Sequence, residues 1–181
     1  MEIIKPNLGK AAMAIKEGKV LVCPTDTVYG LICDAGNKKA LERLYKIKKR
    51  SRKKPIPIFV GSIRMAKKLA RISGEQEEFL RKVWPGKMTV VLERKKGGTV
   101  GLRVPNYAFV LNLIGRVNRP LTGTSANISG QPASTKVKEV REQFNNRRPQ
   151  PDLIIDAGNL PPSKPSTVID LTIWPPKILR N

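Results

Sequence analysis

Short apolar segments alternate with amphipathic segments along this chain, and no apolar stretch is longer than a few residues. Residues 8–16 place apolar side chains at the i, i+3, i+4 and i+7 spacing of an amphipathic helix, and Gly18 is expected to close that helix. Residues 20–23 are all apolar and are stopped by Pro24, a pattern typical of a buried strand. Because helices and strands alternate without a regular period, the sequence predicts a layered α/β or α+β fold with a mixed β-sheet.

The same two patterns predict the remaining elements. Helices are expected at 37–48, with Asn37 as the N-cap, and at 63–72, 74–83 and 137–144. Strands are expected at 56–60, 88–92, 100–104, 120–124, 153–158, 167–170 and, at a sheet edge, 178–180. Pro57 also favours an edge position for 56–60, because proline has no N–H to donate. The Asn-, Arg- and Pro-rich stretch 145–152 is interpreted as a loop, so residues 1–181 are expected to form a single domain.

The chain contains no histidine, which excludes Ser-His-Asp and Cys-His nucleophiles and every His-ligated metal site. Two cysteines, Cys23 and Cys33, are too few for a four-cysteine zinc site and are expected to be free thiols. No apolar run approaches the roughly 20 residues that cross a bilayer, and the first ten residues carry no signal-peptide core. A cytoplasmic protein without a membrane partner is therefore expected.

Lys and Arg number 35 against 14 Asp and Glu, a formal net charge of +21. The excess is concentrated between Lys38 and Lys54, where ten cationic residues face one acid, Glu42. Such crowding favours a polyanionic partner, either a nucleotide phosphate or an RNA backbone. The alternative is a solvated basic face that only maintains solubility.

Four polar segments interrupt the apolar framework. They are 24–30, which follows a buried strand; the basic segment 48–55; 84–89 together with Arg103; and 122–130, which is rich in Ser, Thr and Gly. Segments 24–30 and 122–130 suit a polar ligand but also suit plain turns, with Asp26 accepting a local hydrogen bond in the first. Arg103 needs an anionic partner if it faces the core and none if it faces solvent. Lys48 and Arg50 are expected on a polar segment outside the core.

Taken together, these segments resemble the YrdC-like family, the L-threonylcarbamoyladenylate synthases. The matching pieces, in chain order, are the Pro-Thr-Asp-Thr-Val-Tyr-Gly-Leu run at 24–31, Lys48-x-Arg50, Trp-Pro-Gly at 84–86 with Thr89, Gly-Leu-Arg-Val-Pro at 101–105, Thr-Ser-Ala-Asn-x-Ser-Gly at 124–130, Ser-Thr-Val-x-Asp at 166–170 and Ile-Leu-Arg at 178–180. The resemblance covers nearly the whole chain. It implies an open, twisted, mixed α/β sheet layered with helices, with an electropositive concave face.

The resemblance also implies a nucleotidyltransferase that makes threonylcarbamoyl-AMP from L-threonine, bicarbonate or CO2, and ATP with Mg²⁺, releasing pyrophosphate. A separate complex would then transfer the threonylcarbamoyl group to adenosine 37 of tRNAs that read ANN codons. Carried over by position, the catalytic pair is Lys48 and Arg50, and the threonine pocket is Thr27, Arg103, Ser125 and Ser166. ATP would be held by Lys48, Arg50, Lys54, Thr99, Asn127, Thr135 and Arg180. The Arg103 guanidinium would then lack a counter-ion until threonine binds.

The sequence departs from the family pattern at four positions, and none of them carries a residue assigned to a ligand. Ile32 replaces a common glycine, Ser51 a common proline, and Phe59 and Tyr107 stand where histidines occur. The chain ends one residue after Arg180, which resembles the short family form without the extra C-terminal domain. The competing hypotheses are a non-enzymatic RNA-binding protein in ribosomal RNA maturation and a carbamoyl-adenylating domain of the hydrogenase-maturation type. Direct RNA contact is also compatible with catalysis.

Overall fold

The computed structural model describes residues 1–181 as two mixed β-sheets and six helices. The five-stranded sheet has the order β1 (Glu2–Ile4), β9 (Leu153–Ile155), β2 (Leu21–Cys23), β3 (Gly30–Ile32) and β8 (Thr124–Ser125). The six-stranded sheet has the order β11 (Lys177–Arg180), β10 (Thr167–Asp170), β5 (Met88–Glu93), β6 (Thr99–Arg103), β4 (Ile58–Phe59) and β7 (Leu121–Thr122). The helices are α1 (Leu8–Lys16), α2 (Lys38–Lys48), α3 (Ile63–Leu69), α4 (Gly74–Val83), α5 (Ala108–Val117) and α6 (Val137–Phe144). The predicted mixed α/β fold is confirmed, whereas the single domain stays a prediction.

The five-stranded sheet is covered by helices on both faces. Along β2, Leu21 and Cys23 belong to the apolar cluster that includes α1 and α5, whereas Val22 belongs to the cluster that includes α2 and α6. Successive side chains of a strand point to opposite faces, so a fully apolar strand is what a sheet with two helical layers requires. The apolar run at 20–23 therefore predicted this burial correctly.

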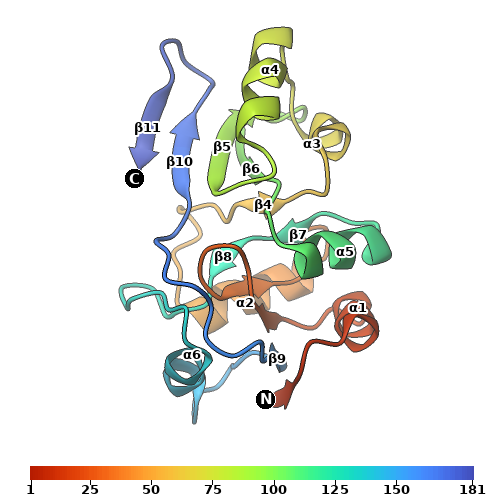
Figure 1. The fold of residues 1–181 in the computed structure, drawn as a ribbon, viewed down its shortest axis with the longest axis vertical. Coiled ribbons are helices and arrows are strands. Elements are labelled where there is room, and N and C mark those ends of the chain that lie inside the picture. The colour runs from red at the N-terminus through yellow and green to blue at the C-terminus, as the bar shows by residue number, and fades with distance from the viewer.

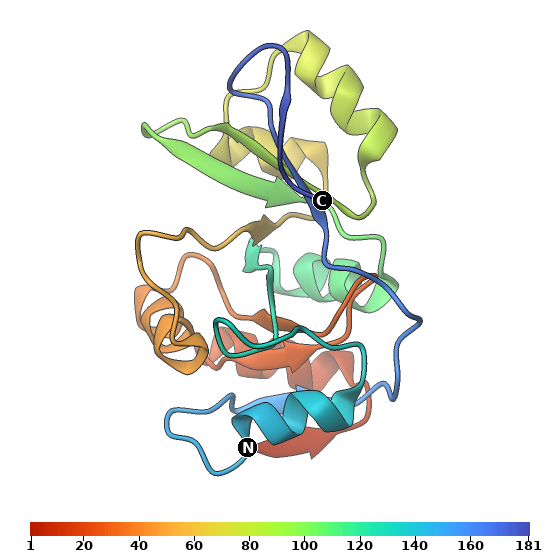
Figure 2. The same ribbon diagram turned by 90° about the vertical axis from the view of Figure 1, so that its left-hand side faces the viewer.

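Helices α3 and α4 pack against one face of the six-stranded sheet, and Figures 1 and 2 show them above the five-stranded sheet. Val90 and Leu92 of β5 join the apolar cluster beneath those helices. Thr89 and Val91 point the other way and line a cavity. The alternation along β5 therefore gives the sheet one core face and one face available to a ligand.

Local signals set the helix ends as the sequence predicts. The Asn37 side chain accepts a hydrogen bond from the Ala40 backbone N–H at 3.1 Å, which caps α2. Gly18 adopts φ = +77° directly after α1, a conformation that glycine reaches without steric cost. The predicted bounds of α1, α4, α6 and β10 agree with the structure.

Three elements were missed: β1, β3 and α5. The two strands have only three residues each, too few for a clear alternation. The signal for α5 was present, because its buried residues follow the helical spacing: Val110, Leu113, Ile114 and Val117. No polar side chain caps its start, since Tyr107 at the N-cap makes no side-chain hydrogen bond.

Three strand or helix predictions need correction. The edge position favoured for the strand at 56–60 is wrong, because β4 lies between β6 and β7. Pro57 precedes β4, so its missing N–H removes no ladder hydrogen bond, and its carbonyl accepts one from Gly123 N at 2.8 Å. The strand expected at 120–124 is broken at Gly123 into β7 and β8, which belong to different sheets. Helix α3 ends at Leu69 rather than 72, because Ala70 pairs with Arg94 in an isolated β-bridge.

Cys23 and Cys33 are free, as predicted, and both are buried. Burial raises the pKa of the Cys33 thiol to about 12. None of the six helices has the length and apolar character needed to cross a bilayer.

Gly123, at the break between β7 and β8, tests how tightly the chain packs there. A Cβ at this position would overlap the Phe59 ring, which is buried and would have to shift. We expect Gly123→Ala to lower the free energy of unfolding by about 1–3 kcal/mol through overpacking. Gly115→Ala is the control, because it lies on the exposed side of α5 with nothing within 4 Å of the added Cβ. Gly115→Ala should raise the free energy of unfolding by up to about 1 kcal/mol. Urea titrations measure both variants, and equal effects of the two changes would contradict this packing.

Candidate active site

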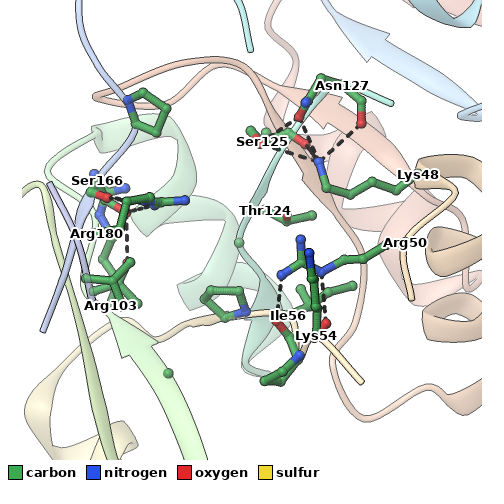
Figure 3. Close-up of a pocket in the computed structure, with 18 of the residues that line it drawn as sticks. Lys48, Arg50, Lys54, Ile56, Arg103, Thr124, Ser125, Asn127, Ser166 and Arg180 are labelled. Atoms are coloured by element: carbon green, nitrogen blue, oxygen red, sulfur yellow. Dashed lines mark hydrogen bonds between the residues drawn. The ribbon is translucent and has the colours of Figure 1, made fainter. Parts of the chain in front are cut away.

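A cavity of about 600 Å³ lies between the two sheets and is lined by 29 residues. It is bounded by the free face of β5, β6 and β10, by the end of α2, and by the segment that follows β8. Its lining carries no carboxylate, but it contains six cationic residues: Lys48, Lys49, Arg50, Lys54, Arg103 and Arg180. Figure 3 shows Lys48, Arg50 and Lys54 on one side of the open space and Arg103 and Arg180 on the other. A cavity with this lining favours an anionic ligand.

Lys48 is buried in the last turn of α2, with 2% of its surface exposed. Its Nζ donates to Ser125 O at 2.6 Å, Asn127 Oδ1 at 2.7 Å and Asn127 O at 3.1 Å. Burial, followed by the charges of Arg50 and Arg180, lowers the pKa of Lys48 to about 7. The expectation that Lys48 lies outside the core is therefore wrong, because α2 turns its last lysine inward against the β8 segment.

The segment after α2 brings Arg50 and Lys54 together. Lys49 at the C-cap has φ = +49°, and this left-handed residue turns the chain out of the helix. Arg50 then donates from Nε to Lys54 O at 2.9 Å and from Nη2 to Pro55 O at 3.0 Å. These bonds hold the guanidinium at the cavity wall and leave donors free for a ligand, since arginine has five.

Arg103 is buried at the end of β6 and is paired with Asp26. Its Nη2 lies 2.6 Å from Asp26 Oδ1, and the two side chains are 3% and 8% exposed. The Nε donates to Gly86 O at 2.8 Å, and Nη1 lies 3.4 Å from Thr27 Oγ1. Burial lowers the pKa of Arg103, and Asp26 opposes that shift.

The expected absence of a counter-ion for Arg103 is thus wrong, because a carboxylate from the other sheet's loop supplies one. Asp26 does not close a local turn. Its second oxygen accepts from the Asn106 backbone N–H at 3.0 Å. Two of the five Arg103 N–H groups still lack a partner. They can donate to a ligand carboxylate.

Ser166 and Arg180 meet beside Arg103. Arg180 donates from Nη2 to Ser166 O at 2.6 Å and lies 3.2 Å from Ser166 Oγ. The same hydroxyl lies 2.9 Å from Thr89 Oγ1 on the neighbouring strand β5. Burial, followed by the charge of Arg50, lowers the pKa of Arg180. The register of β10 with β5 and β11 therefore joins hydroxyls and a guanidinium that are distant in sequence.

The structure brings nearly all the sequence-predicted site residues to this one cavity. Its lining includes Thr27, Lys48, Arg50, Lys54, Thr99, Arg103, Ser125, Asn127, Ser166 and Arg180. Thr135 is the exception and is not among the lining residues. Its carbonyl accepts from Leu160 N at 2.9 Å, in the bridge between Lys136 and Asn159 that precedes α6.

Sequence reasoning missed Asp26 as a site residue and assigned no role to Thr25 or Thr89. Thr25 Oγ1 donates to Val28 O at 2.7 Å and lies 3.1 Å from Thr27 Oγ1, which shapes the loop beneath Arg103. The signal for Asp26 was available: a single carboxylate follows a buried strand, and Arg103 stands alone in another. A buried charge is costly unless it is paired, so these two residues of opposite charge were candidates to pair with each other.

The four departures from the family pattern fall in different places. Phe59 and Ser51 line the cavity, and the Phe59 ring lies 5.6 Å from the Arg103 guanidinium carbon, within cation–π range. Tyr107 packs against the apolar cluster of α1 and α5, and Ile32 is buried in β3. Neither Tyr107 nor Ile32 lines the cavity.

The chain belongs to the Sua5/YciO/YrdC family, because residues 13–181 match the family Sua5_yciO_yrdC, whose description reads "Telomere recombination". It is 39% identical to the threonylcarbamoyl-AMP synthase of Pyrococcus abyssi, over 94% of this chain and 52% of that protein. It is 34% identical to a putative threonylcarbamoyl-AMP synthase of Methanocaldococcus jannaschii, over 87% and 76% of the two chains.

A structure of P. abyssi Sua5 complexed with L-threonine is similar in fold, with a TM-score of 0.88 and 35% identity. The match covers 99% of this chain and 56% of that one. This chain therefore spans about half the length of the P. abyssi relative.

The buried Lys48 predicts how stability depends on pH. Its folded pKa of about 7 lies below the unfolded value near 10.5, so between these values the unfolded chain binds a proton that the folded protein does not. The free energy of unfolding should therefore rise with pH, by about 2 kcal/mol from pH 6.5 to 8.5. Urea titrations of the wild type and Lys48→Met measure the difference between the two slopes. Parallel pH profiles would contradict the buried, titrating lysine.

The Asp26–Arg103 pair predicts a second stability effect. Asp26→Asn leaves a buried guanidinium without its counter-ion and should lower the free energy of unfolding by about 3–5 kcal/mol. The control is Glu42→Gln, whose partner Arg52 lies 3.6 Å away in an exposed ion pair worth at most about 1 kcal/mol. Urea unfolding measures both variants, and a loss at Asp26 as small as that at Glu42 would exclude a structural role for the pair.

Proposed function

We propose that this chain synthesises L-threonylcarbamoyl-AMP from L-threonine, bicarbonate or CO2, and MgATP, with release of pyrophosphate. The observation that supports this most is a cavity that joins a cationic wall to a buried arginine surrounded by hydroxyls. Such a cavity suits one ligand with a polyphosphate and one with a carboxylate. Relatives that match this chain over most of its length carry the name threonylcarbamoyl-AMP synthase.

The two ends of the cavity suggest how the substrates divide it. We assign the triphosphate to the side of Arg50 and Lys54, with the charge of Lys48 behind the β8 segment and Arg180 across the cavity. Asn127 and Thr99 belong to the same nucleotide site. Arginine suits phosphate because its planar fork binds two oxygens at once. Thr135 is left out of this assignment.

We assign threonine to the end with Arg103. Its two free N–H groups suit the carboxylate, and Asp26 fixes the direction in which they point. The hydroxyls of Thr27, Ser125 and Ser166 surround the place where the amine and the threonine hydroxyl would lie. A site that hydrogen-bonds a substrate hydroxyl rejects analogues without it, because a buried group is left unpaired.

The proposed chemistry requires no histidine and no covalent enzyme intermediate. The threonine nitrogen adds to the carbon of CO2 and loses a proton, which gives a carbamate. A carbamate oxygen then bonds to the α-phosphorus as the bond from that phosphorus to the pyrophosphate oxygen breaks. The protein supplies position and charge stabilisation, and well-oriented reactants can gain about 7–11 kcal/mol of the barrier.

Magnesium enters this proposal as part of the substrate MgATP. The cavity lining offers hydroxyl and amide oxygens but no carboxylate. Mg²⁺ keeps several waters and binds phosphate oxygens readily, so such a lining suits an ion carried in by the triphosphate. The cationic residues would share the remaining phosphate charge.

The product would serve tRNA modification. A threonylcarbamoyl adenylate is an activated acyl donor, and we propose that a separate complex transfers its acyl group to adenosine 37 of tRNAs that read ANN codons.

A cytoplasmic location is part of the proposal, because ATP, threonine and tRNA meet there. The net charge of +21 exceeds what one nucleotide needs, so direct RNA contact is part of it as well. An RNA-binding protein without catalysis is the alternative that a lack of this activity would favour.

The proposal is tested by pyrophosphate release from MgATP. Release should require both threonine and bicarbonate, and omitting either should return it to background. Arg50→Ala should lower kcat/KM by about 10- to 150-fold, because one charge-assisted phosphate contact is worth about 1.5–3 kcal/mol. Arg52→Ala is the matched control, since Arg52 is exposed over Tyr45 and does not line the cavity. Release that ignores threonine would refute the proposed reaction.

A further inference from the structure

The Lys48 ammonium group has more hydrogen-bond partners inside the protein than a lysine that bound phosphate would have. Four oxygens lie within 3.4 Å of its Nζ, and all of them belong to Ser125 and Asn127. An ammonium group has three N–H donors. All three have acceptors inside the protein, so none is left for a ligand in the cavity. Figure 3 shows the lysine directed at these two residues, while Arg50 and Lys54 lie apart from it.

The two acceptor residues form a closed network of their own. Ser125 Oγ donates to Asn127 Oδ1 at 2.7 Å, and Asn127 Nδ2 donates to Gln131 O at 2.5 Å. The loop is also tied to the end of α2 through its backbone, since Ser129 N donates to Lys48 O at 2.8 Å. Lys48 thus ties both cavity-lining residues to the end of α2.

We propose that Lys48 is a positioning residue that holds the 125–129 loop in its ligand-binding shape and makes no contact with the triphosphate. This inference deepens the proposed function and rests on its division of the cavity. Because Ser125 is assigned to threonine and Asn127 to the nucleotide, one lysine would prepare both subsites. If Lys48 instead bound the triphosphate, its loss would weaken the binding of the nucleotide alone.

The charge of Lys48 makes this role sensitive to pH. Burial, Arg50 and Arg180 together lower the pKa of Lys48 to about 7, and no carboxylate is in contact with it to oppose them. A neutral amine keeps two donors, so one of the Ser125 and Asn127 oxygens loses its partner. A polyphosphate beside Arg50 and Arg180 would offset their charges and return the proton. Ligand binding and loop order would then support each other.

The first test needs no ligand. The chain has no histidine, so no side chain with an ordinary pKa near 7 competes with Lys48. In ¹⁵N NMR spectra of the wild type, the backbone amides of Ser125, Ala126 and Asn127 should shift with a midpoint near pH 7. The same amides should not titrate in Lys48→Met, whereas they should in Lys46→Met, which removes an exposed lysine from the same helix. Loop amides that stay fixed from pH 5.5 to 8.5 in the wild type would overturn the inference.

The second test compares the two ligands. Calorimetric titrations of MgATP and of L-threonine should each show at least a tenfold weaker Kd in Lys48→Met than in Lys46→Met. A loss confined to MgATP would overturn the positioning role and make Lys48 a phosphate ligand. If neither ligand binds the wild type, the proposed function fails, and the NMR titration still decides whether Lys48 holds the loop. If Lys48→Met does not fold, the NMR titration of the wild type still tests whether Lys48 holds the loop, and loop amides that do not titrate would overturn the inference.

Discussion

The concentration of cationic side chains around one cavity is the constraint on which the site depends. Six cationic residues line this cavity without a carboxylate among them. A buried cation is costly unless hydrogen bonds or a counter-ion hold it. The protein meets this need in two ways: carbonyl and amide oxygens surround Lys48, and Asp26 pairs with Arg103. Arg50, Lys54 and Arg180 have no carboxylate partner, so the cavity keeps positive charge that an anion can offset.

The Asp26–Arg103 pair also joins the two sheets. Asp26 follows β2 of the five-stranded sheet, and Arg103 ends β6 of the six-stranded sheet. The cavity lies between these sheets, so the pair fixes one of its ends. Buried ion pairs contribute little net stability, but breaking one is expensive. The pair also holds the guanidinium at one angle, which suits the binding of the carboxylate that we propose.

Much of this could be predicted from the sequence because the relevant signals are local. The helical spacing of 8–16, the Asn37 cap and the apolar run at 20–23 depend on near neighbours, and each gave the right element. The polar segments were recognised as candidate ligand-binding segments because hydroxyls, glycines and cations interrupt the apolar strands. The family resemblance then named eleven site residues. Ten of them line one cavity, and Thr135 lies outside it.

From the sequence alone came most of the helices and strands, the apolar faces of those elements and the residue types that line the cavity. Tertiary structure alone decided which charges pair. Asp26 and Arg103 are 77 positions apart, and Lys48 reaches Ser125 across the same distance in sequence. No local pattern shows that one lysine is buried and its neighbour exposed, because burial depends on which strand the helix end meets. The break of 120–124 is also a tertiary effect, because β7 pairs with β4 in one sheet and β8 pairs with β3 in the other.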